Sequence, residues 1–148
     1  MIEMLLVLAA ASSLAQPSLQ PFWPLVGHCW SGPLPGDQGT DRHCFQSVYG
    51  GQHVRDTHAV TVGGKIVYEG ETLYSVRGQQ IVFTYWNSLG GLGTGTAAVA
   101  GKGLRFSGTV HGTPNGAEKP IATIWTIGPD GYQVSADGEA PRSFKLAD

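Results

Sequence analysis

The alternation of apolar and polar residues over residues 52–88 limits this chain to β structure more than any other feature of its sequence. Three runs, QHVRDTHAVTV, KIVYEGETLYSV and QQIVFTYWNS, follow one another there and are rich in β-branched and aromatic residues. In the first run, every second residue from Val54 to Val62 falls on one face, as the two-residue period of a strand requires. The separators Gly63-Gly64 and Arg77-Gly78 suit tight hairpin turns. The stretch therefore predicts a meander of antiparallel strands.

The remainder of the chain repeats this pattern of short apolar runs separated by turns. Its 148 residues include 22 glycines and 9 prolines, which is typical of many short strands and not of a helical protein. Such a meander closes most simply into an all-β, antiparallel, up-and-down β-barrel of about 8–10 strands, which leaves no exposed edge. A β-sandwich of two sheets is the alternative. We expect a single barrel domain over residues 16–148, because the chain is too short for two ordinary domains.

The first 15 residues are similar to a secretory signal peptide. They are apolar from Met4 to Ala11 and end in SLA, a small-x-small cleavage pattern, although Glu3 stands where a basic residue is usual. The apolar run is far shorter than the roughly 20 residues that span a bilayer, so we expect no permanent membrane span. A frayed N-terminal helix is the alternative. This segment predicts export, and hence a periplasmic or secreted protein.

The two cysteines, Cys29 and Cys44, fall on consecutive expected strands. In an exported protein such a pair predicts a disulfide. Each cysteine is preceded by a histidine, so His28 and His43 complete a nominal zinc set of two histidines and two cysteines. Adjacent residues of a strand point to opposite faces, which disfavours that set. We therefore expect a disulfide and no metal.

A tryptophan between glycines, Gly27-x-x-Trp30-x-Gly32, follows a short apolar turn at residues 21–26. This opening resembles that of calycin-type barrels, the group that includes lipocalins, fatty-acid-binding proteins and nitrobindin-like proteins. The resemblance implies a barrel that holds a small apolar molecule, with Trp30 closing one end. Nitrobindin-like barrels bind haem through a histidine near the C-terminal end, whereas no histidine follows His111 here. Haem on His58 or His111 therefore stays an alternative, and we expect no cofactor.

The best candidates for a ligand site are polar and aromatic residues embedded in the three runs. Asp56 and His58 share a face with apolar residues and are predicted to orient a polar head group. An ordinary core histidine and a hydrogen-bonded aspartate are the alternative. Aromatic side chains with a few fixed polar groups are typical of a pocket for an apolar ligand, and equally of a β core. The full predicted ligand-binding set is Trp30, Asp56, His58, Tyr68, Glu71, Tyr85, Trp86 and Asn87.

No motif in the sequence names a reaction. Asp56 and His58 lack an identifiable nucleophile, so they define no hydrolase triad and we expect no catalytic residues. Glu69 and Glu71 have the spacing of paired glycosidase carboxylates, but solvent exposure explains them as well. The GTGTAA segment at residues 93–98 matches a dinucleotide fingerprint, although glycines after it prevent the helix that the motif needs.

Charge and composition narrow the possible partners. A net charge of -2 provides no basic surface for a phosphate backbone, which disfavours nucleic acid. We predict an exported protein that binds a small apolar molecule and has no catalytic activity of its own. The alternatives are an envelope structural or interaction protein with a solid barrel, and a small enzyme using Asp56 and His58. The sequence leaves the oligomeric state open.

Overall fold

Short hairpins join the three central runs into neighbouring antiparallel strands, as the alternation predicts. Strand β3 (His53–Val62) turns into β4 (Lys65–Arg77) through Gly63 and Gly64, whose φ angles of 58° and 77° are readily adopted by glycine. Gly78, with φ 64°, then turns β4 into β5 (Gln80–Asn87). Along β3 the side chains of Val54, Asp56 and Val60 are buried, so one face of the strand lies inside the molecule.

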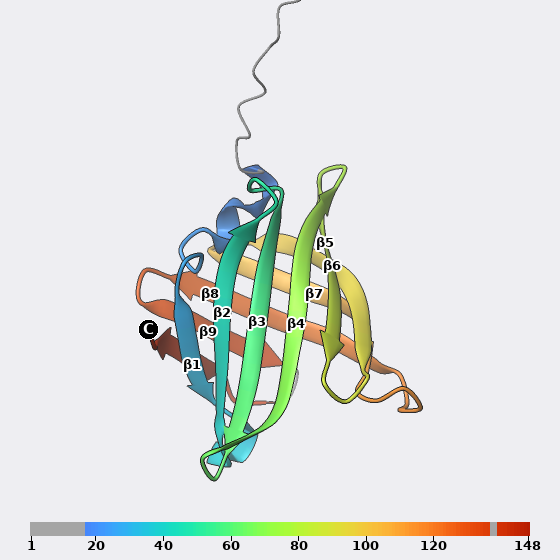
Figure 1. Ribbon diagram of the computed structural model, residues 1–148. Helices are drawn as coiled ribbons and strands as arrows, with labels where there is room; N and C mark the ends of the chain where they lie inside the picture. The colour runs from blue at the N-terminus through green and yellow to red at the C-terminus, as the bar shows by residue number, and fades with distance from the viewer. Residues whose placement is uncertain (1–16, 137–138) are drawn as a thin grey trace, which may run out of the picture.

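The computed structural model describes residues 17–136 and 139–148 and shows a closed barrel of ten antiparallel strands (Figure 1). Each strand pairs with its neighbours in sequence, and the first pairs with the last, so the predicted up-and-down barrel is confirmed. The remaining strands are β1 (Cys29–Pro33), β2 (Thr40–Val48), β6 (Leu92–Ala100), β7 (Gly103–His111), β8 (Lys119–Gly128), β9 (Gly131–Ala136) and β10 (Arg142–Leu146). The signal-peptide prediction concerns residues 1–15, which lie outside the described residues. No helix of the described chain has the length and apolar character needed to cross a bilayer.

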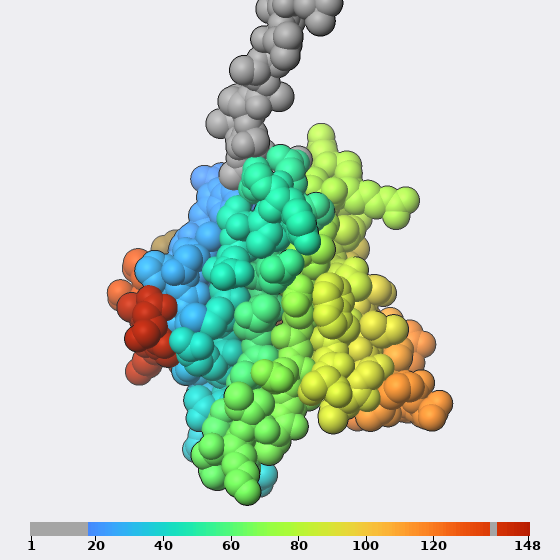
Figure 2. All heavy atoms as spheres, in the orientation of Figure 1, coloured from blue at the N-terminus to red at the C-terminus, as the bar shows by residue number. Residues whose placement is uncertain are grey.

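A short 3-10 helix, η1 (Pro17–Phe22), covers one end of the barrel, at the top of Figure 1. Leu19, Phe22 and Leu25 are fully buried there, and the Phe22 ring stacks on Tyr74 with 4.3 Å between ring centroids. A second 3-10 turn, η2 (Pro35–Asp37), lies in the loop between β1 and β2. In the orientation of Figure 2 the atoms over β2, β3 and β4 form an unbroken wall.

Two glycines let the backbones of β6 and β7 approach closely where a bulky aromatic enters the core. Gly95 and Gly108 are directly paired across the two strands. A Cβ on Gly95 would lie 2.7 Å from the Phe83 ring and 2.8 Å from the Cα of Gly108. The glycine-rich segment is therefore a thin strand at a close approach, which agrees with the strand interpretation and leaves no helix for a dinucleotide.

A disulfide joins β1 to β2, as the sequence predicts. Cys29 and Cys44 are directly opposite one another in the antiparallel pair, and their sulfur atoms are bonded. Both sulfur atoms are in this bond, so neither cysteine provides a thiolate for the zinc set with His28 and His43. A structural disulfide is typical of proteins in an oxidising compartment outside the reducing cytosol.

Removing this disulfide is expected to lower the free energy of unfolding by about 3 kcal/mol, because the bond closes a loop in the unfolded chain. The bonded residues are 15 apart in sequence, and that separation sets the size of the effect. Denaturant unfolding of the double variant Cys29→Ser, Cys44→Ser against the oxidised protein measures it. An unchanged midpoint would show that the bond restricts the unfolded chain very little.

Candidate functional site

A partly open cavity of about 320 Å³ lies among inward-facing side chains of the barrel. This volume lies within the usual range of small-molecule pockets, roughly 300–1,000 Å³. Seven aromatic residues line it, together with aliphatic, hydroxyl and charged side chains at its edge. The lining consists of Asp41, His43, Thr72, Tyr74, Phe83, Tyr85, Phe106, Ile121, Thr123, Trp125, Tyr132, Val134, Arg142 and Phe144.

A stack of three aromatic rings forms one wall of the cavity. Tyr132 lies parallel to Phe144 at a centroid distance of 4.7 Å and against Trp125 at 4.9 Å. Its ring is buried, and its hydroxyl has no hydrogen-bond partner within the described chain. Burial raises the pKa of this hydroxyl well above 10, so it stays protonated at neutral pH. The wall thus offers a flat apolar surface and one free hydrogen-bonding group.

The charged corner of the cavity comes from two Asp-x-His tripeptides on neighbouring strands. Asp41 and His43 lie on β2, and Asp56 and His58 lie on β3. In each tripeptide both side chains point into the barrel, since residues two apart on a strand share a face. The register places His43 directly opposite His58. The two aspartates then lie on either side of this histidine pair along the barrel axis.

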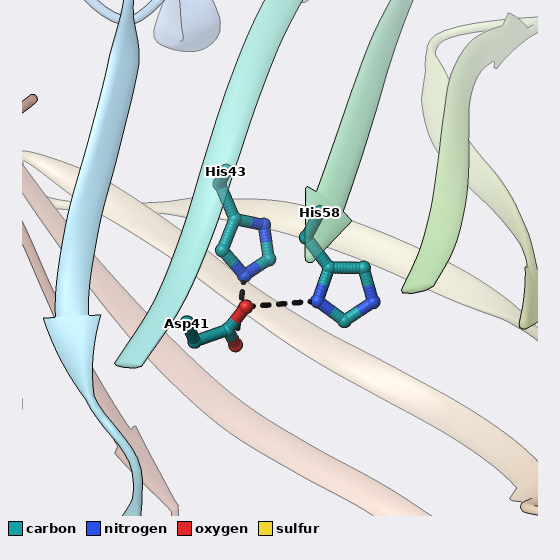
Figure 3. A group of neighbouring side chains, drawn as sticks. All are labelled: Asp41, His43 and His58. Atoms are coloured by element: carbon teal, nitrogen blue, oxygen red, sulfur yellow. Dashed lines mark hydrogen bonds and ion pairs between the residues drawn. The ribbon is translucent and has the colours of Figure 1, made fainter. Parts of the chain in front are cut away.

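Hydrogen bonds link the four residues into a chain, and we call them the Asp-His cluster. Asp56 contacts His43 Nδ1 through both oxygens, at 2.7 and 3.0 Å. Asp41 contacts His43 Nε2 at 3.1 Å and His58 Nδ1 at 3.0 Å (Figure 3). The two imidazole rings stack with 4.6 Å between centroids. Asp41 thereby bridges both histidines, while Asp56 holds His43 from the other side.

The charges within the cluster stabilise one another despite burial. Burial opposes a charged His43, but the Asp56 carboxylate and the hydrogen bonds to Asp41 and Asp56 outweigh it and raise the pKa of His43 to about 10. Burial likewise opposes ionisation of Asp41, yet hydrogen bonds to His43 and His58 bring the pKa of its carboxyl far below 3.8. At neutral pH His43 is therefore a cation held between two carboxylates.

The structure places four of the predicted site residues inside the barrel near this cluster. Asp56 is 2% exposed and lies behind His43, outside the cavity lining. The His58 ring contacts Tyr68 and Tyr85, at centroid distances of 5.2 and 6.0 Å. Tyr85 is the only one of the four that lines the cavity. Asp56 and His58 thus both lie inside the barrel, Asp56 buried and His58 partly buried, and they adjoin the cavity through Asp41 and His43.

The other four predicted residues lie elsewhere. Trp30 is buried, and its indole donates a hydrogen bond to the Leu25 carbonyl at 3.1 Å, so it belongs to the plugged end of the barrel. Trp86 is 38% exposed and follows Tyr85 in β5, so it points to the outer face. Glu71 pairs with Arg55 at 3.0 Å on that outer face. Asn87 accepts hydrogen bonds from the amides of residues 89 and 91 and closes the β5–β6 turn. Its side-chain amide also donates to the Tyr85 hydroxyl at 3.4 Å, so Asn87 adjoins the cavity lining without being part of it.

Asp41 and His43 were missed as site residues, although the sequence contains a signal for them. The tripeptide Asp41-Arg42-His43 repeats the pattern of Asp56-Thr57-His58 on the preceding expected strand. Antiparallel pairing of two such strands brings four chemically reactive side chains to one face. The sequence interpretation instead counted His43 toward the zinc set with the cysteines.

Two further hollows lie alongside η1, outside the barrel interior. One has a volume of about 440 Å³ and lies between η1 and the β6–β7 hairpin, and the other has about 570 Å³ beside the β4–β5 hairpin. Lys102 is the one ionisable residue in their linings, which otherwise consist of small, apolar and amide side chains. Two smaller linings elsewhere also contain ionisable residues, Arg105 in one and His111 with Glu118 in the other. The barrel cavity combines charged side chains with seven aromatic residues, so we take it as the candidate site.

The fold and the site together define an antiparallel β-barrel with an aromatic cavity and a buried, charged Asp-His corner. The architecture is compatible with the calycin-type barrels that the tryptophan motif resembles. The chain matches no protein-family model, and no curated protein sequence matches it significantly.

Proposed function

We propose that this protein binds a small, mainly apolar molecule inside its barrel, in the manner of calycin-type carriers, and does so in the periplasm or outside the cell. The observation that carries the proposal is the aromatic cavity with its polar corner. A pocket of this kind, apolar over most of its wall with a few fixed polar groups, is the usual form of a small-molecule site. The disulfide supports the oxidising compartment.

The lining indicates how such a molecule would lie. Its apolar body would pack on the stacked rings of Trp125, Tyr132 and Phe144. A polar head group would reach Asp41 and His43, with the free Tyr132 hydroxyl and Arg142 as further partners. A planar or short-chain compound with one polar end suits this arrangement. Trp86 and Glu71, which lie on the outer face, would take no part.

Filling the cavity is expected to abolish binding. Ile121 lines the cavity from β8, whereas Ile124 of the same strand is 40% exposed. An Ile121→Trp substitution places a bicyclic ring in a space of only 320 Å³ and should weaken binding of a displaceable fluorescent lipid analogue at least tenfold, about 1.4 kcal/mol. Titration followed by the fluorescence of the probe measures it.

The matched control is Ile124→Trp, which adds the same ring outside the barrel and should leave the affinity within about twofold, or 0.4 kcal/mol. Circular dichroism and thermal unfolding establish that both variants fold. If the natural chain binds no probe displaceably, or if both variants bind equally well, the cavity is not the binding site. The solid-barrel structural or interaction protein would then be the better account.

A further inference from the structure

We propose that Asp41, His43 and His58 bind a divalent transition-metal ion, of which Zn²⁺ is the first to test. One ligand atom from each of these residues lies within 4.8 Å of the others. Both imidazoles direct a ring nitrogen at the same carboxylate, as Figure 3 shows, at 3.1 Å for His43 Nε2 and 3.0 Å for His58 Nδ1. The proposal stands independently of the apolar ligand.

These separations fit a bound ion with little movement of the strands. In a tetrahedral zinc site with bonds of about 2.0–2.1 Å, neighbouring ligand atoms lie roughly 3.3 Å apart. The two nitrogen–oxygen distances, one to each oxygen of Asp41, are within a few tenths of an ångström of that value, and the three ligand atoms all lie within 4.8 Å of one another. An ion entering between them would displace the protons that His43 Nε2 and His58 Nδ1 direct at Asp41, and three coordinate bonds would replace the two hydrogen bonds. Binding therefore releases protons to solvent and strengthens as the pH rises.

The surroundings hold the histidines in the orientation that coordination needs. Metal-binding histidines commonly hold their second ring nitrogen against a carboxylate, which fixes the ring and its tautomer. Asp56, 2% exposed, does this for His43 Nδ1 at 2.7 Å and leaves Nε2 toward Asp41. Asp56 is thus a positioning residue, and its charge also compensates a cation at this buried place.

The orientation of His58 depends on a glycine in the adjacent strand. His58 lies opposite Gly70, and a Cβ at that position would collide with His58 Nε2. This nitrogen is buried and has no hydrogen-bond partner within the described part of the chain, and the side chain is only 10% exposed. The missing side chain of Gly70 therefore leaves room for the His58 ring with Nε2 toward Gly70 and Nδ1 toward Asp41. No hydrogen bond to Nε2 holds the ring in this orientation.

The donor set determines the class of ion. Two imidazoles and one carboxylate suit Zn²⁺ and its first-row neighbours, whereas Ca²⁺ and Mg²⁺ prefer sites built almost entirely of oxygen. Both cysteines are in the disulfide, so no thiolate competes for the ion. Three protein ligands leave a fourth position open. Since Asp41 and His43 line the cavity, that position faces the space where a small molecule would lie.

The test is Zn²⁺ binding to the full oxidised chain after removal of metal with a chelator, measured by calorimetry and by elemental analysis after gel filtration. We expect one ion per chain. His58→Gln should weaken binding at least about 100-fold, and Asp56→Asn about 10- to 100-fold, the usual effect of losing a partner behind a ligand. His111→Gln is the control, because that ring is bonded to a backbone carbonyl in an exposed turn, away from the cluster. It should bind as the natural chain does.

Less than a tenth of an ion per chain, or unchanged affinity in His58→Gln, would overturn the assignment. Equal losses in His58→Gln and His111→Gln would show adventitious binding to surface histidines. If His58→Gln does not fold, imidazole NMR signals of the natural chain decide the question. Zn²⁺ should shift the resonances of His43 and His58 and leave those of His53 and His111 in place, and the reverse pattern would reject the site.

Discussion

Replacing Asp56 by alanine is expected to lower the free energy of unfolding by about 3–5 kcal/mol, the largest effect of any single substitution that we predict. The reason is that Asp56 neutralises the His43 cation in the barrel interior, at 2.7 Å and with 2% of its own side chain exposed. Removing one partner of a buried ion pair leaves the other charge without compensation. Urea unfolding of the metal-free protein, followed by circular dichroism, measures the change.

Glu71→Ala provides a matched control on the neighbouring strand. Its carboxylate also pairs with a cation, Arg55 at 3.0 Å, but about a quarter to a third of each side chain is exposed. Partly exposed ion pairs contribute roughly 0–1 kcal/mol, so this substitution should have a small effect. Replacing Asp56 and His43 together by leucine should recover part of the loss, because the His43 charge is removed with its partner and Asp41 keeps its contact with His58. If Asp56→Ala costs no more than Glu71→Ala, the interior pair does not have the energetic role assigned to it.

Raising the pH from 6.5 to 10 is expected to destabilise the metal-free protein by a few kcal/mol. His43 has a pKa of about 10 in the folded chain and an ordinary value of 6.5 when unfolded. The folded state therefore holds one proton more than the unfolded state across this interval. The resulting stabilisation is complete below pH 6.5 and is lost as the pH approaches 10, with a slope of at most about 1.4 kcal/mol per pH unit.

The groups that face His43 decide the shape of this profile. Asp41 contacts its Nε2 and Asp56 contacts its Nδ1, and the His58 ring stacks on the His43 ring. The pKa of Asp41 lies below its ordinary value of 3.8, so its contribution is present above that pH and is lost on acidification. Stability should therefore be greatest between about pH 4 and pH 6.5.

Unfolding free energies measured at pH 6.5 and 9.5 test this for the natural chain and for His43→Gln, whose amide does not titrate. The variant should be less stable at pH 6.5 and show almost no slope toward pH 9.5. An equal slope in both proteins would mean that other groups produce the alkaline loss. Tyr74 and Tyr132, whose pKa values burial raises well above 10, contribute only at higher pH than this range.

The strand pattern was predictable because its cause is local. Alternation along residues 52–88 gives each strand an inner and an outer face, and glycines such as Gly63 and Gly64 set the hairpins. The same alternation predicted that Asp56 and His58 share one face of their strand, and both side chains lie inside the barrel. For Tyr85 and Trp86, adjacent residues both assigned to the site, a two-residue period allows only one to face the cavity, and that one is Tyr85.

The composition of the site was less predictable, because it depends on register between strands. Asp41 and His43 are distinguished in the sequence only by repeating the Asp-x-His pattern of Asp56 and His58. They become the charged corner of the cavity only when His43 lies opposite His58 across β2 and β3. Likewise, the sequence gives no reason for a glycine at position 70 within a strand. The structure does, because Gly70 is paired with His58 and a Cβ there would collide with the His58 ring.

The sequence by itself determined the all-β class, the antiparallel order of hairpins and the pairing of Cys29 with Cys44, since each follows from short-range spacing and side-chain chemistry. Only the tertiary structure decided that β1 meets β10, that a partly open cavity remains inside the barrel, and that four separate side chains form one hydrogen-bonded cluster. The physical reason is that closure of a barrel fixes which inward side chains meet, and those contacts join residues far apart along the chain.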